Sequence, residues 1–73
     1  MANARVTHEV RIADYPELAL ICWNIHTDTV GEAEALAIYE RNWRFVDEAA
    51  MTPRERALLE RLVHEYGRGV LHV

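Results

Sequence analysis

The sequence contains no lysine, no serine and no glutamine, and it has a single cysteine. Without serine and lysine there is no serine nucleophile, no lysine for a Schiff base and no P-loop lysine. One cysteine cannot form a disulfide within the chain. These absences exclude many familiar enzyme classes, so we expect a protein without enzymatic activity and without a cofactor.

Glycine and proline are also scarce, with 3 and 2 residues among 73. Hydrophobic residues make up 51% of the chain, which is too apolar for intrinsic disorder, and the length suits one domain over residues 1–73. No apolar run approaches the length of a membrane span, and residues 1–5 lack the pattern of a secretory signal. We therefore expect a cytoplasmic protein that makes no contact with a membrane.

The first helix is short and apolar on nearly all sides. The sequence Asp-Tyr-Pro-Glu at 14–17 predicts a helix start with Asp14 as the N-cap and a proline in the first turn. Residues 18–23 then cover almost the whole circumference with apolar side chains, so we expect this helix to be central. A buried strand over residues 18–25 is the alternative, because apolar content alone does not separate the two.

Two longer helices follow. Thr29-Val-Gly-Glu32 reads as a capping box for an amphipathic helix expected over about residues 30–49. Thr52-Pro-Arg-Glu55 is a second box with proline at the first helical position, and it predicts a helix over Pro53–Tyr66. Gly67 is then expected to be the C-terminal glycine with positive φ.

Strands are expected at both ends of the chain. Residues Val6 to Ile12 alternate between apolar and polar, and residues 70–73 form a short apolar run. The two segments could pair with each other as a small sheet. The predicted fold class is therefore α+β and helix-dominated, in the order strand, short buried helix, long amphipathic helix, third helix and short C-terminal strand.

Asn42 is the most unusual position in the long helix, because it falls within the apolar arc. An unpartnered buried amide would cost roughly 1–3 kcal/mol, so we expect a hydrogen-bond partner. Either Asn42 fixes the register between two copies, as buried asparagines do in coiled coils, or it bonds to loop or strand backbone within one chain. Buried amides most often bond to backbone, which favours the second hypothesis.

The apolar arc of helix 30–49 is the predicted contact surface for another protein. Tyrosine, tryptophan and arginine, which commonly anchor interfaces, gather in and around this helix. The chain also has more apolar residues than so small a domain can bury, which favours a homodimer. We therefore predict an interaction module that self-associates, with an unidentified protein partner also possible, through Ile38, Tyr39, Asn42, Trp43, Phe45 and Val46.

Two alternative functions have weaker support in the sequence. His26 and Asp28 lie close enough in one loop to ligate zinc, but the chain has no paired-ligand motif. The second and third helices could form a helix-turn-helix that binds nucleic acid. The formal charge of −4 argues against that function, because nucleic-acid binders usually carry a clustered basic face.

Residues 39–47 read Tyr-Glu-Arg-Asn-Trp-Arg-Phe-Val-Asp. This segment resembles a helix shared by a set of small, uncharacterised bacterial proteins. The resemblance extends to the helix and glycine at 53–67 and covers about the C-terminal half of the chain. It implies a bacterial source, and it implies no particular function.

Overall fold

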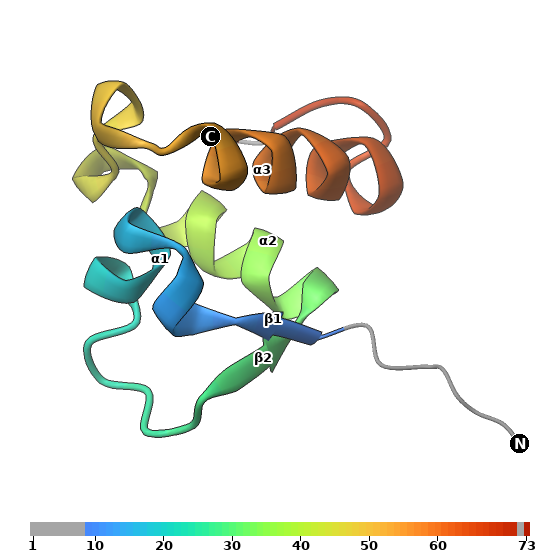
Figure 1. The fold of residues 1–73 in the computed structure, drawn as a ribbon. Coiled ribbons are helices and arrows are strands. Elements are labelled where there is room, and N and C mark those ends of the chain that lie inside the picture. The colour runs from blue at the N-terminus through green and yellow to red at the C-terminus, as the bar shows by residue number, and fades with distance from the viewer. Residues whose placement is uncertain (1–8, 72) are drawn as a thin grey trace, which may run out of the picture.

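The fold is helix-dominated α+β, as the sequence predicts, and is described by a computed structural model for residues 9–71 and 73. Three helices pack together, and a two-stranded antiparallel sheet lies at one side of them (Figure 1). The elements in chain order are β1 (Glu9–Arg11), the 3-10 turn η1 (Ile12–Asp14), α1 (Pro16–Ile21), β2 (Thr29–Gly31), α2 (Glu32–Arg41), the 3-10 turns η2 (Trp43–Phe45) and η3 (Glu48–Ala50), and α3 (Pro53–Tyr66).

The sheet joins different strands from those expected. β1 pairs with β2, with Val10 opposite Val30, and not with residues 70–73. Val70 and Leu71 are not in a strand, and residue 72 lies outside the described residues, as does the part of the expected first strand before Glu9. The Thr29 hydroxyl donates to the Glu9 carboxylate across the pair. Thr29 is thus a strand residue, and the expected capping box at 29–32 is wrong.

The segment for which the sequence leaves helix and strand open begins as a helix, α1. It spans only six residues, Pro16–Ile21, and its N-cap is Tyr15, not Asp14. Its N-cap side chain makes no capping hydrogen bond. Leu18 and Ile21 are buried while Leu20 is exposed, so α1 lies at the edge of the core and is not enclosed on all sides.

α2 ends eight residues earlier than the periodicity predicts, at Arg41 rather than 49. Both the backbone N–H and the side-chain amide of Asn42 donate to the carbonyl oxygen of Ile38. This closes the last turn, and the chain continues as η2 and η3. Asn42 thus bonds to backbone within the chain, but to its own helix and not to a loop or strand.

α3 has the predicted bounds, Pro53–Tyr66, and the Thr52 hydroxyl accepts from the Glu55 N–H as predicted. The expectation for Gly67 is wrong in one respect, because its φ is −105°. The positive φ values belong to Arg68 and Gly69. Gly67 is required for space, since a Cβ there would lie 2.7 Å from the carbonyl oxygen of Val70.

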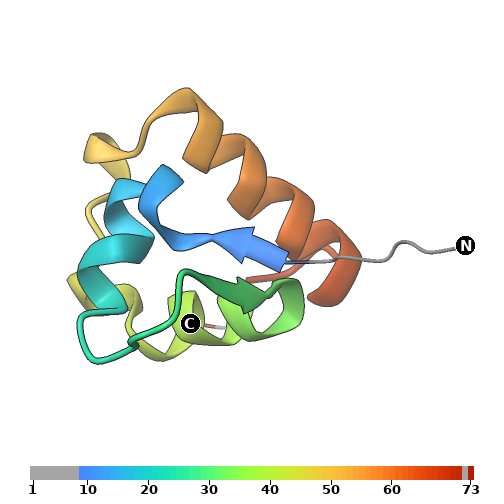
Figure 2. The ribbon, with the colours of Figure 1, turned by 60° about the horizontal axis from the view of Figure 1, so that its bottom comes forward.

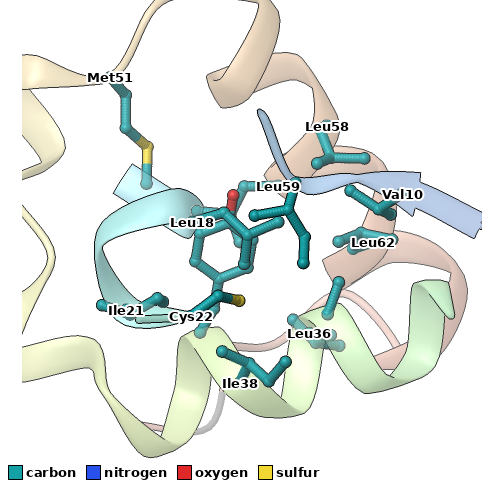
Figure 3. Close-up of a cluster of buried hydrophobic side chains, with 13 residues drawn as sticks. Val10, Leu18, Ile21, Cys22, Leu36, Ile38, Met51, Leu58, Leu59 and Leu62 are labelled. Atoms are coloured by element: carbon teal, nitrogen blue, oxygen red, sulfur yellow. The ribbon is translucent and has the colours of Figure 1, made fainter. Parts of the chain in front are cut away.

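The core lies where α1, α2 and α3 face one another and the sheet closes one side (Figure 2). Side chains of all three helices and of β1 converge there, and Met51 reaches in from the segment before α3 (Figure 3). Tyr39, Leu18, Ile38 and Leu62 are the largest fully buried apolar side chains. α2 and α3 therefore form the scaffold against which α1 is held.

Candidate functional site

Three large apolar side chains are exposed on one side of the molecule. Leu20 is 65% exposed, Trp23 80% and Phe45 64%. Single exposed apolar residues are ordinary, whereas a cluster of large ones makes this face a candidate interaction surface. We call these three residues the Trp23 patch.

The Trp23 patch surrounds a hollow of about 240 Å³. The C-terminal end of α1 and the turn after it form one wall, and the C-cap of α2 and η2 form the other. The hollow is lined by Leu20, Ile21, Trp23, Asn42 and Phe45. A projecting indole and a cavity with mostly apolar lining thus lie side by side on one face.

The charge at the edge of the patch is positive. The Arg44 guanidinium carbon lies 5.0 Å from the centre of the Phe45 ring, which is cation–π distance. Within the described part of the chain, Arg44 makes no ion pair, whereas Arg41 pairs with Glu34 at 3.7 Å. The residues lining the hollow include no carboxylate.

The buried carboxylate of Glu55 fixes the N-terminus of α1. Its two oxygens accept hydrogen bonds from the backbone N–H groups of Glu17 and Leu18, at 3.0 and 2.9 Å. The first N–H groups of a helix have no partner within the helix, and an anion is favoured at that end. Because Tyr15 supplies no side-chain cap, a residue of α3 caps α1 instead.

Tyr39 of α2 completes this network. Its hydroxyl donates to Oε2 of Glu55 at 2.6 Å, and both side chains are fully buried. Burial, and then the hydrogen bond to Glu55, raise the pKa of Tyr39 far above its ordinary value. The phenol therefore stays protonated and remains a donor, so one carboxylate joins α1, α2 and α3.

A second buried carboxylate joins the two walls of the hollow. Glu17 of α1 accepts a hydrogen bond of 2.9 Å from the backbone N–H of Asp47, just after η2. Glu17 is only 5% exposed. α1, which carries Leu20, is thereby tied to the segment that carries Phe45.

The predicted interface residues do not form one surface. Ile38 and Tyr39 are fully buried in the core of this chain, so they are not available to a partner. Trp43 and Val46 are partly buried and pack against that core. Asn42 lines the hollow, and Phe45 is the only one of the six that is largely exposed.

Leu20 and Trp23, which form most of the exposed patch, are not among the six interface residues predicted from the sequence. Both belong to the segment that the sequence predicts to be a helix buried on nearly all sides. The apolar pattern does not reveal their exposure, because the neighbouring Leu18 and Ile21 are equally apolar and are buried.

The candidate metal ligands are not gathered into a site. His26 and Asp28 are both exposed in the loop before β2. Among the described residues, no group of three histidine, cysteine, aspartate or glutamate side chains is placed to hold a metal ion. Cys22 is buried, and burial together with the nearby Glu34 raises the pKa of its thiol, which keeps it in the unreactive protonated form.

Two of the arginines of α3 are engaged with carboxylates, and the third, Arg56, donates to the backbone carbonyl of Glu48 at 2.7 Å. Arg61 makes a two-pronged contact with Glu32, at 3.1 and 2.6 Å, and Tyr66 donates to the same carboxylate. Arg54 pairs with Asp14 at 3.3 Å. These pairs tie α3 to the start of α2 and to η1, and they reduce the positive charge that a recognition helix would offer to phosphates.

Comparisons with protein-family models, with curated proteins and with solved structures find no match. In the part of the chain that the structure describes, no helix has the length and apolar content needed to cross a membrane. Any functional assignment therefore depends on the geometry of the molecule itself.

Proposed function

We propose that the protein is a cytoplasmic, non-enzymatic interaction module that pairs with a second copy of itself through the Trp23 patch. The observation that carries this proposal is the 80% exposure of Trp23 directly beside a hollow lined largely by apolar groups. This surface replaces the helix 30–49 surface that the sequence suggests, since Ile38 and Tyr39 are buried.

A second copy suits this face because the face is self-complementary. In a two-fold dimer the same surface of each copy meets the other, so a projection and a cavity on one face can be filled reciprocally. Trp23 of each copy would enter the hollow between Leu20 and Phe45 of the other. Burying a side chain of this size contributes roughly 4–6 kcal/mol before the costs of association are subtracted.

The charges near the patch are compatible with this pairing. The chain carries a formal charge of −4, so two copies repel one another over most of their surfaces. No carboxylate lines the hollow, and the edge carries Arg44. A guanidinium attracts the face of an aromatic ring, and tryptophan is the strongest partner for this contact. Arg44 would therefore attract the incoming indole.

Sedimentation velocity over a concentration series tests the proposal. We expect the wild type to dimerise and Trp23→Glu to remain monomeric at the same concentrations, with an unchanged circular dichroism spectrum because Trp23 packs little against its own chain. Leu20→Glu is a second variant at an exposed position of the patch. Val70→Glu changes another exposed apolar residue outside the patch and should dimerise like the wild type.

A wild type that stays monomeric at every concentration contradicts the proposal. It is also contradicted if Val70→Glu loses the dimer as completely as Trp23→Glu does, because the effect would then reflect added charge and not the patch.

A further inference from the structure

A second and larger hollow lies against another side of Trp23. Its volume is about 500 Å³, within the range of roughly 300–1,000 Å³ that small-molecule sites occupy. The walls come from the end of β1, η1, α1 and the loop that leads into β2. Its lining residues include Arg11, Ala13, Ala19, Trp23, Ile25 and Asp28. We call it the Arg11 groove.

The Arg11 groove has one charge of each sign. Arg11 and Asp28 are both exposed, and the structure shows no ion pair or side-chain hydrogen bond for either within the described residues. Their backbones are held together, because Arg11 is paired with Thr29 in the sheet and the Ile12 N–H donates to the Asp28 carbonyl at 3.0 Å. The end of β1 and the loop before β2 thus place a guanidinium and a carboxylate at one junction, and the two groups do not pair with each other.

The polar part of the groove's exposed surface is larger than the apolar part, and the apolar part comes mainly from residues of η1, α1 and the turn after it. Ile12 and Cys22 are buried beneath the groove, and Ala13, Ala19 and Ile25 add aliphatic surface. The Cys22 thiol is protonated and behaves as a small hydrophobe. Trp23 contributes a large aromatic group. The groove therefore combines a smaller apolar area beside Trp23 with polar surface and two opposite charges, so it can orient an amphipathic small molecule.

We infer that the Arg11 groove binds a free α-amino acid with an aromatic or branched aliphatic side chain. Arg11 would pair with the α-carboxylate, which suits the planar fork of a guanidinium. Asp28 would accept hydrogen bonds from the α-ammonium group. The side chain of the amino acid would lie on the apolar lining against Trp23.

Other ligand chemistries fit the two charges less well. A phosphate would be attracted by Arg11 but repelled by Asp28. The end of a peptide carries either an ammonium or a carboxylate, whereas a free amino acid carries both groups on its α-carbon. The opposite charges on the groove are complementary to that zwitterion, and this complementarity is what selects the occupant.

The first experiment compares three probes by two-dimensional amide NMR on the wild-type protein. L-Phenylalanine has both charges, 3-phenylpropionate lacks the ammonium and 2-phenylethylamine lacks the carboxylate. We expect L-phenylalanine to shift resonances of residues 11–13 and 22–28, and each single-charge probe to bind at least roughly ten times more weakly. Absence of such shifts at millimolar L-phenylalanine, or equal binding of all three probes, would overturn the inference.

The second experiment removes the protein charges one at a time. Arg11→Met should weaken binding of L-phenylalanine and 3-phenylpropionate and leave 2-phenylethylamine unchanged. Asp28→Asn should weaken L-phenylalanine and 2-phenylethylamine and leave 3-phenylpropionate unchanged. The matched controls are Arg41→Met and Glu60→Gln, at exposed positions away from the groove lining, and they should change nothing. If Arg11→Met weakens the binding of all three probes equally, Arg11 does not contact the carboxylate of the ligand.

Binding in the Arg11 groove requires no second copy of the chain. Phe45 belongs to the Trp23 patch and does not line the Arg11 groove. Phe45→Glu should therefore abolish self-association and retain L-phenylalanine binding. A wild type that dimerises but does not bind L-phenylalanine would contradict only the proposed ligand of the groove. A wild type that binds L-phenylalanine but stays monomeric would contradict only the proposed self-association.

Discussion

The hydroxyl of Tyr39 donates a 2.6 Å hydrogen bond to the carboxylate of Glu55, and both side chains are fully buried. The same carboxylate also accepts the first backbone N–H groups of α1. A buried carboxylate is costly unless its oxygens are bonded, and here each oxygen has partners. Glu55 therefore links three helices, and it holds α1 in the orientation that exposes Leu20 and Trp23.

Glu55→Gln should destabilise the fold although the side chain keeps its size. The amide has one acceptor oxygen, and its NH₂ group would face a backbone N–H of α1, so a buried donor loses its partner. We expect a loss of about 1.5–3 kcal/mol in the free energy of unfolding, measured by urea denaturation. Glu60→Gln, exposed on the same helix, should change stability by less than about 0.5 kcal/mol. Equal stability of the two variants would contradict the capping role.

Tyr39→Phe should change how stability depends on alkaline pH. The folded chain raises the pKa of Tyr39 above 10.0, so above about pH 10 the unfolded chain loses this proton while the folded chain keeps it. The folded state then binds more protons, and the stability due to Tyr39 falls as pH rises, by about 1.4 kcal/mol per pH unit. In urea denaturation between about pH 9 and pH 11, the free energy of unfolding of Tyr39→Phe should therefore fall less steeply with pH than that of the wild type.

Leu58→Ala is the control for that experiment. It removes buried apolar volume without removing a titrating group, so it should lower stability at neutral pH by roughly 2–5 kcal/mol and keep the alkaline slope. If Tyr39→Phe and wild type lose stability in parallel above about pH 10, the folded state does not hold the Tyr39 proton as described.

The parts of the fold that sequence predicts well are those determined by nearby residues. α3 has a hydroxyl N-cap, a proline at its first position and a glycine after its end, all within one continuous segment, and its bounds are as predicted. α1 and β2 depend on partners far along the chain. The cap of α1 comes from Glu55, and the partner of β1 is Thr29–Gly31, which local pattern identified as a helix start.

Glu55 could have been recognised as buried from its spacing. Positions 55, 58, 59 and 62 have the spacing of one helical face, and the last three are leucines, so this glutamate lies on the apolar face of α3. Glu32 stands in the same relation to Ala35, Leu36 and Tyr39. Both are buried in the structure. The spacing predicts burial, but it does not say which distant groups provide the hydrogen bonds.

Glu17→Ala should loosen the Trp23 patch. It removes the carboxylate that accepts the Asp47 N–H, and an unpartnered backbone donor in this partly buried place costs about 1–3 kcal/mol. Glu17→Gln retains an acceptor oxygen and should cost less. We expect Glu17→Ala, but not Glu17→Gln, to weaken self-association in sedimentation velocity. If both variants associate like the wild type, the Glu17 contact does not hold the patch in shape.

Gly67→Ala should destabilise the end of α3 because there is no space for a Cβ. That atom would lie 2.7 Å from the Val70 carbonyl oxygen and 3.0 Å from that of Val63, and both are backbone atoms that belong to the same tight turn. Relieving the overlap requires the turn to open, at a cost of about 1–3 kcal/mol in the free energy of unfolding.

Gly31→Ser is the matched control for that substitution. A Cβ at Gly31 meets nothing within 4 Å, φ is −62°, and serine is a favoured residue at the helix N-cap that Gly31 occupies. Its stability in thermal denaturation should therefore equal or slightly exceed that of the wild type. A Gly67→Ala variant as stable as Gly31→Ser would mean that the chain after Tyr66 does not pass as close to residue 67 as the turn requires.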